Sequence, residues 1–136
     1  MSYANKDNYN FTPEEADELW VDTFGDVAIA KDAAGKLIMR NMHGKTDSFG
    51  WEIDHIWPKQ NLKEARVATS IINSKCNLRP LNWKTNKSRS TSLPEYISTA
   101  RFLALCKVLF PNLRLTERLQ LAIDWLDAIN NIKHDV

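Results

Sequence analysis

Four polar residues in the middle of the chain have the types and the order of a hydrolytic site. Asp54 and His55 are adjacent, and the amides Asn77 and Asn86 follow further along the chain. Carboxylate and amide oxygens are suitable ligands for hard divalent cations such as Mg²⁺ or Mn²⁺. A histidine has an unperturbed pKa of about 6.5, so its neutral ring can take a proton from water. Taken singly these signals are weak, because Asp-His pairs are mostly structural and asparagines commonly serve in turns and caps.

Two strands and a helix are expected around these residues. The stretch 51–56 alternates in polarity and is rich in β-forming residues, which predicts a strand that ends near Pro58. Residues 77–81 predict a second short strand, and Pro80 favours an edge position because proline has no backbone N–H. A short helix is expected over 83–89. The order of these elements is therefore strand, strand, helix.

This order suggests how the polar side chains come together. Neighbouring side chains on a strand point to opposite faces, so Asp54 and His55 can serve one site only where the strand ends or bends. A helix that crosses the two strands would bring Asn86 towards Asp54. The spacing thus predicts one site at the end of the first strand.

The segments that carry these residues resemble the HNH, or ββα-metal, nuclease motif. The matching stretches are EIDHIWP at 52–58, CNLRPL at 76–81 and NKSR at 86–89. They are similar to the form found in many phage and bacterial HNH proteins, with Asn as the last motif residue, as in the HNH domain of RNA-guided CRISPR nucleases. The resemblance covers residues 51–89 of 136. It implies an α+β fold with a ββα-metal core.

The resemblance also implies a role for each motif residue. Asp54 would be a metal ligand, and Asn86 the second ligand. His55 would be the general base that activates water. Asn77 would brace the loop between the strands and help to orient the His55 ring. One divalent ion, Mg²⁺ or Mn²⁺, would then support hydrolysis of DNA phosphodiester bonds, leaving a 5′-phosphate and a 3′-hydroxyl.

The charge distribution agrees with a polyanionic partner for the motif region. Residues 1–26 contain seven acidic residues and one lysine, whereas residues 65–94 contain six basic residues and no acid. Such asymmetry favours nucleic-acid binding by the basic part, although chance clustering on a solvated surface would give the same pattern. The expected contacts to the phosphate backbone are Arg79, Lys84, Lys87 and Arg89.

The chain departs from the family pattern in two places. Many members have Gly-Gly between the two halves of the motif, whereas the segment 59–76 here is longer and contains no glycine. Many also have Lys where this chain has Arg89. No Cys-x-x-Cys pair is present, so a structural zinc is not expected, and Cys76 and Cys106 are read as reduced thiols, with a disulfide left open.

The remaining elements would flank the motif within a single domain, 1–136. A capping box at Thr12 and Glu15 predicts a helix over 13–24, and two apolar runs around the turn 32–35 predict a hairpin. The helical pattern over 61–74 is weak. Further expected features are a C-terminal helical extension over 92–133 with helices at 92–110 and 116–132, and core packing rather than base stacking for Trp57 and Trp83.

Several functional classes remain to be weighed. No apolar run reaches the roughly 18 residues of a membrane span, and Met1–Asn10 lacks a signal-peptide pattern, so a cytoplasmic protein is expected. A DNA endonuclease is the leading hypothesis. The alternatives are a non-catalytic nucleic-acid-binding module, disfavoured by the joint presence of Asp54 and His55, and a nuclease toxin with an immunity partner. The C-terminal helices leave a homodimer open.

Overall fold

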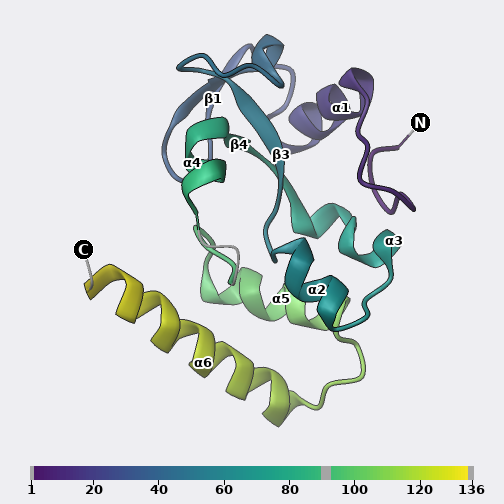
Figure 1. Ribbon diagram of the computed structural model, residues 1–136, viewed down its shortest axis with the longest axis vertical. Coiled ribbons are helices and arrows are strands. Elements are labelled where there is room, and N and C mark those ends of the chain that lie inside the picture. The colour runs from purple at the N-terminus through teal and green to yellow at the C-terminus, as the bar shows by residue number, and fades with distance from the viewer. Residues whose placement is uncertain (1, 90–92, 135–136) are drawn as a thin grey trace.

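The computed structural model describes residues 2–89 and 93–134, and it has an α+β fold (Figure 1). Within these residues six α-helices accompany two separate two-stranded antiparallel sheets. The helices α5 and α6 lie below the second sheet in Figure 1, and α1 lies beside it. None of the helices in this part of the chain is long and apolar enough to cross a membrane.

Helix α1 spans Pro13–Phe24, as the sequence predicted. The Thr12 hydroxyl accepts a hydrogen bond from the backbone N–H of Glu15 at 3.1 Å, and the Glu15 carboxylate accepts one from the Thr12 N–H at 3.0 Å. This reciprocal cap satisfies two N–H groups that a helix start otherwise leaves unpaired. The apolar face of α1 buries Trp20 against Trp51 of the second sheet. The helix therefore supports the strand that carries the motif.

The predicted hairpin is present as β1, Ile29–Lys31, paired with β2, Leu37–Met39. Asp32 closes its turn, because one carboxylate oxygen accepts hydrogen bonds from the N–H groups of Ala34 and Lys36. The other oxygen accepts the N–H of Asn82 at 2.8 Å. Asp32 thus joins the hairpin to the second sheet.

The second sheet consists of β3, Trp51–His55, and β4, Leu78–Asn82, and helix α4, Trp83–Ser88, follows directly. Asn82 caps α4 by accepting hydrogen bonds from the backbone N–H groups of the second and third residues after it. The predicted order of strand, strand and helix is confirmed. The second strand begins one residue later than expected, because Asn77 ends a 3-10 turn.

The outer edge of β4 offers no free N–H to another strand. The Leu78 N–H donates to the Lys75 carbonyl, Pro80 has no N–H, and the Asn82 N–H is bound by Asp32. Within the described residues β4 pairs only with β3, so the edge position expected from Pro80 is confirmed.

The connection between the two strands forms two short helices, α2 at Lys59–Glu64 and α3 at Thr69–Ile72. The weak helical pattern over 61–74 is therefore not one helix. Arg66 lies between α2 and α3 with φ 60°, a left-handed conformation that no α-helix accommodates. Leu62 of α2 and Ile72 of α3 are both buried in one core cluster with Ile56, the residue that follows β3.

The C-terminal helices are α5, Thr99–Leu109, and α6, Leu115–His134. The prediction that a helix starts near residue 92 was wrong for the described residues. Residues 93–98 are not helical, and Ser98 caps α5 instead, its hydroxyl accepting the Arg101 N–H at 3.2 Å. A proline at 94 and a positive φ at Tyr96 keep this stretch irregular.

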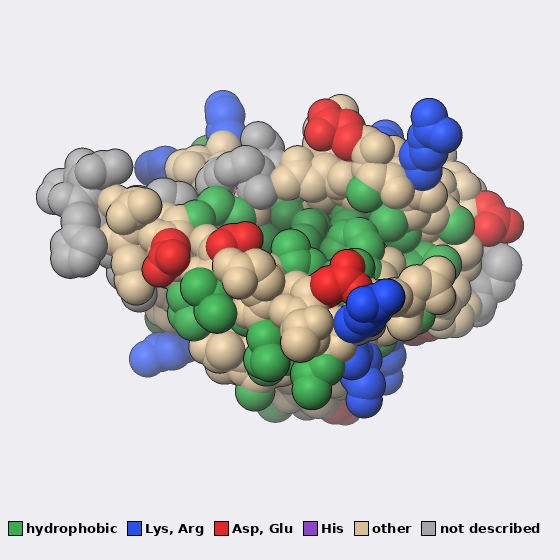
Figure 2. Space-filling model, turned by 90° about the horizontal axis from the view of Figure 1, so that it is seen from below, with side chains coloured by type: hydrophobic (Ala, Val, Ile, Leu, Met, Phe, Trp, Pro, Cys, Tyr) green, Lys and Arg blue, Asp and Glu red, His purple; other side chains and the backbone are tan. Residues whose placement is uncertain are grey.

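Aromatic packing joins these helices to the rest of the protein. The rings of Phe102 and Trp125 stack with centroids 4.3 Å apart, and Trp57 packs on Phe102 at 5.1 Å and on Phe110 at 5.2 Å. Trp57 therefore belongs to the core, as expected. The outer side of α6 is apolar and exposed (Figure 2), through Leu115, Leu119, Ile123 and Leu126.

Both cysteines are free thiols. Cys106 is buried in the cluster between α5 and α6, and burial raises the pKa of its thiol to about 11. The thiol therefore stays protonated near neutral pH and packs as a small apolar side chain.

Candidate active site

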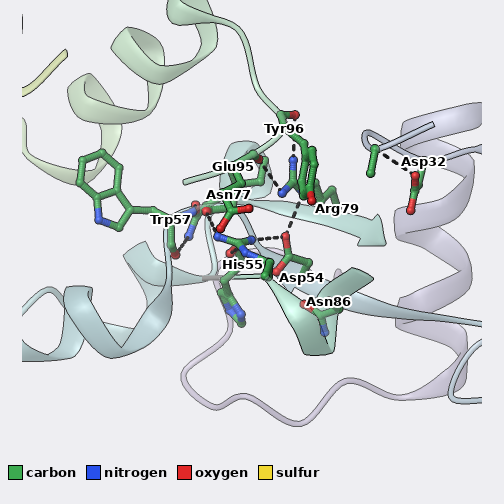
Figure 3. Close-up of polar contacts among 12 residues, drawn as sticks. Asp32, Asp54, His55, Trp57, Asn77, Arg79, Asn86, Glu95 and Tyr96 are labelled. Carbon is green, nitrogen blue, oxygen red and sulfur yellow. Dashed lines mark hydrogen bonds and ion pairs between the residues drawn. The ribbon is translucent and has the colours of Figure 1, made fainter. Parts of the chain in front are cut away.

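A small pocket of about 200 Å³ lies where β3 ends beside α4. Asp54 and His55 line it from the end of β3, and Asn86 lines it from α4 (Figure 3). The structure thus brings together three of the predicted site residues, and it does so at the strand end, as the argument from side-chain alternation required. We call this cavity the β3–α4 pocket; its other lining residues are Ile53, Pro58, Lys59 and Arg89.

Asp54 is buried and its carboxylate is held by two arginines. Its Oδ2 atom accepts a hydrogen bond from Nε of Arg79 at 2.9 Å and another from Nη1 of Arg89 at 2.6 Å. Within the described residues no hydrogen bond reaches its Oδ1 atom. A buried carboxylate is stabilised when opposite charges and hydrogen bonds replace lost water. The two arginines therefore fix Asp54 while leaving one oxygen for other chemistry.

Arg79 continues inward from Asp54 to the irregular stretch before α5. Its Nη1 donates to the Tyr96 carbonyl at 3.1 Å, and its Nη2 donates to the Glu95 carbonyl at 2.8 Å (Figure 3). Its side chain is only 7% exposed. Burial lowers the pKa of Arg79, and the neighbouring Asp54 carboxylate opposes that shift. Arg79 thus works inside the protein as a tie between β4 and the chain that leads to α5.

Arg89 makes the corresponding tie after α4. Its Nη1 also donates to the His55 carbonyl, and its Nη2 donates to the carbonyls of Ile56 and Leu93. Its side chain is 5% exposed. The contact of Arg79 and Arg89 with a nucleic-acid backbone stays a prediction. The hydrogen bonds described for both side chains go to Asp54 and to backbone carbonyls of the protein itself. The other two predicted contacts, Lys84 and Lys87, are exposed on α4.

The His55 ring is held by Asn73, a residue that the sequence argument did not identify. His55 Nε2 lies 2.7 Å from Oδ1 of Asn73. The Asn73 Nδ2 group donates to the carbonyls of Lys6 and Asn8, so its oxygen must be the acceptor and Nε2 of His55 the donor. This hydrogen bond leaves Nδ1 of His55 as the ring's proton acceptor.

The protonation of His55 follows from its surroundings. Burial lowers the pKa of His55, the hydrogen bond to Asn73 opposes that shift, and the charge of Lys59 lowers the pKa further. A lowered pKa keeps the ring neutral near neutral pH. The ring is thus in the state that can accept a proton.

The N-terminal segment forms one wall beside His55. The Tyr9 ring meets the imidazole edge-on with centroids 5.7 Å apart, and the Phe11 ring lies at 6.4 Å. Asn73 is fully buried beneath this segment. Nothing in the sequence spacing distinguishes Asn73 from an ordinary turn asparagine, since its partners come from distant parts of the chain.

Asn86 is oriented by Glu52, a second residue that sequence reasoning missed. The Nδ2 group of Asn86 donates to Oε2 of Glu52 at 2.9 Å. This contact fixes which end of the amide faces the carboxylate and leaves the Asn86 Oδ1 atom for another partner. The two-residue spacing of Glu52 and Asp54, which places them on one face of β3, was the available signal.

Asn77 is buried and braces the chain, and its side-chain hydrogen bonds go to the backbone of Trp57 and Ile72 rather than to the His55 ring. Its Oδ1 accepts the Trp57 N–H at 2.7 Å (Figure 3). Its Nδ2 donates to the Ile72 carbonyl at 2.9 Å. These bonds tie the end of β3 to the turn that precedes β4, as expected of a bracing residue. The ring-orienting part of its predicted role belongs to Asn73.

The donor atoms in the pocket fit a hard divalent cation. Asp54 and Asn86 line the pocket and each present one oxygen without a hydrogen-bond partner among the described residues, and Glu52 accepts a hydrogen bond from the Asn86 amide. No group of three or more His, Cys, Asp or Glu residues suited to a metal occurs in this part of the chain. Mg²⁺ commonly takes one or two protein oxygens and completes its shell with water and substrate phosphate, so two ligands suffice.

Comparisons of the chain with protein-family models, curated proteins and solved structures give no match. The HNH resemblance therefore rests on the residues of the motif alone.

Proposed function

We propose that this protein is a metal-dependent endonuclease that hydrolyses phosphodiester bonds in DNA. The observation that supports this most directly is that Asp54, His55 and Asn86 line one small pocket at the end of β3. Metal-assisted hydrolysis needs a histidine that can accept a proton beside oxygen atoms that can bind a metal ion, and these three residues supply both.

His55 is the general base in this proposal. Its Nε2 hydrogen is donated to Asn73, so Nδ1 takes the proton from the attacking water. Burial keeps the ring neutral before the reaction. The Tyr9 wall restricts the ring, which lowers the cost of holding the base in its reactive orientation.

Asp54 and Asn86 hold the metal in this proposal. A divalent ion held by these two residues would supply positive charge to offset the charge that develops on the phosphate and on the leaving 3′ oxygen. Arg79 and Arg89 hold Asp54 from behind, and Glu52 holds the Asn86 amide, so both ligand oxygens are oriented before metal arrives.

The products provide a test. Incubation of supercoiled plasmid with the protein and Mg²⁺ or Mn²⁺ is expected to give nicked or linear DNA, and EDTA is expected to prevent it. Hydrolysis that leaves a 5′-phosphate and a 3′-hydroxyl makes nicks that DNA ligase reseals without further treatment. Cutting that continues in EDTA, or nicks that ligase cannot reseal, would contradict the proposal.

A further inference from the structure

Two lysines on α2 share one aromatic ring at the border of the β3–α4 pocket. The Nζ atoms of Lys59 and Lys63 lie 4.7 Å and 4.6 Å from the centroid of the Tyr9 ring. They are four residues apart, which places both on one face of the helix. Lys59 also lines the pocket itself. We call Lys59 and Lys63 the α2 lysine pair.

The α2 lysine pair concentrates positive charge that the described part of the protein does not neutralise. Both side chains are exposed, and neither forms an ion pair with a described carboxylate. The Tyr9 ring attracts both ammonium groups, while their like charges repel one another. An anion that bridged the two lysines would remove this repulsion.

The position of the α2 lysine pair relates it to the candidate site. The same Tyr9 ring that holds both lysines meets the His55 ring edge-on. Arg79 and Arg89, the other cations near the pocket, donate inward to Asp54 and to backbone carbonyls. The exposed lysines on the two helices that border the pocket are instead Lys59 and Lys63 of α2 and Lys84 and Lys87 of α4.

We propose that Lys59 and Lys63, ordered by Tyr9, form a subsite for a phosphate of the nucleic-acid backbone next to the one that is cut. This inference rests on the proposed nuclease function and adds a substrate path. The backbone enters over α2, crosses the pocket, and leaves over Lys84 and Lys87 of α4. Tyr9 acts as a positioning residue that keeps both ammonium groups beside His55.

The test measures how DNA binding depends on salt, in the His55→Ala background and in EDTA, so that no cleavage occurs. Each phosphate that the protein neutralises contributes about 0.9 to the slope of log K against log salt for duplex DNA. Because Lys59 and Lys63 share one phosphate in this proposal, the variant K59Q/K63Q is expected to reduce that slope by about 0.9 on a duplex oligonucleotide. The matched control is K36Q/K107Q, which removes two exposed lysines from the hairpin turn and from α5.

A second pair of variants tests the role of the aromatic ring. The Tyr9 hydroxyl has no hydrogen-bond partner among the described residues, so Tyr9→Phe is expected to keep wild-type binding. Tyr9→Leu removes the ring and is expected to weaken binding and reduce the slope. Equal binding by the Phe and Leu variants would contradict the positioning role of Tyr9.

The outcomes separate this inference from the proposed function. A slope for K59Q/K63Q equal to that of K36Q/K107Q, in a protein whose wild-type form cuts plasmid, would overturn the subsite and leave the nuclease in place. Absence of both DNA binding and cutting by the wild-type protein would overturn both. A reduced slope specific to K59Q/K63Q supports the subsite.

Discussion

The β3–α4 pocket and the α5–α6 pair are built by different interactions. In and around the pocket, polar groups are fixed by named partners: Asp54 by two arginines, the His55 ring by Asn73, and the Asn86 amide by Glu52. Between α5 and α6, packing is aromatic and apolar. Metal affinity and turnover at the pocket should therefore depend on the geometry and charge of its side chains. The stability of the α5–α6 pair should depend on side-chain volume.

The largest expected loss of stability at the pocket comes from Asp54→Ala. This change removes the carboxylate that Arg79 and Arg89 both bind, and breaking a buried ion pair in this way costs about 3–5 kcal/mol. Urea unfolding measures the loss. Asp54→Asn keeps the volume and one acceptor, so it should lose less stability while still losing metal affinity. A loss below about 1 kcal/mol for Asp54→Ala would show that the arginines have other support.

Phe102→Ala in the helical region is expected to lose a similar amount of stability, but to leave metal binding at the pocket unchanged. Removing this buried ring costs about 3–5 kcal/mol of unfolding free energy. Metal affinity, measured by calorimetry well below the melting temperature, should stay within about twofold of wild type, less than about 0.5 kcal/mol. Trp57 stacks on Phe102 and binds Asn77, so a large fall in affinity would show that this contact couples the two regions.

Asn73→Ala should reduce turnover with little change in metal affinity. The variant frees the His55 ring and removes the acceptor for Nε2. Since a general base contributes about 10²–10⁴ to a rate, loss of its orientation should cost about tenfold to a hundredfold in kcat. Asn73→Asp keeps the acceptor oxygen and is the matched comparison. Wild-type kcat in Asn73→Ala would remove Asn73 as a positioning residue.

Asn86→Ala should weaken metal binding, because it deletes one of the two proposed ligand oxygens. Calorimetric titration with Mn²⁺ should show affinity lower by about tenfold or more, within the range seen when metal sites lose a supporting group. Glu52→Gln should have a smaller effect, since it leaves Asn86 in place but weakens its orientation. Unchanged affinity in Asn86→Ala would exclude it as a ligand.

The smallest effect is expected on the outer face of α6. Leu119 is 45% exposed, and surface substitutions usually change stability by less than about 0.5 kcal/mol. Leu119→Lys should therefore leave thermal unfolding and cleavage unchanged. A clear change in sedimentation or in stability would show that this apolar face is covered in solution.

Local signals predicted most elements that hold the site. The capping box at Thr12 and Glu15 predicted the start of α1. The alternating polarity of 51–56 predicted β3, and Pro80 predicted that β4 is an edge strand. These signals act between residues that are close in the sequence. The late start of α5 was missed because the irregular residues before it are tied by Arg79, which lies far away in the chain.

The candidate site was predictable in its residue types but not in its partners. Charge and spacing identified Asp54, His55 and Asn86, which line one pocket. They could not distinguish a buried arginine from an exposed one, because burial of Arg79 follows from its register opposite Asp54. Nor could they identify Asn73, whose contacts depend on how the N-terminal segment folds over α3.

The most direct test of the central claim is plasmid cleavage by wild type, His55→Ala and His134→Ala, each with Mg²⁺, Mn²⁺ or EDTA. His134 is the last residue of α6 and serves as the matched histidine control. The account predicts metal-dependent cutting by wild type and His134→Ala, and none by a folded His55→Ala protein. Equal turnover by His55→Ala would contradict the general-base assignment. A wild-type protein that fails to cut plasmid with either Mg²⁺ or Mn²⁺ would contradict the proposed nuclease function itself.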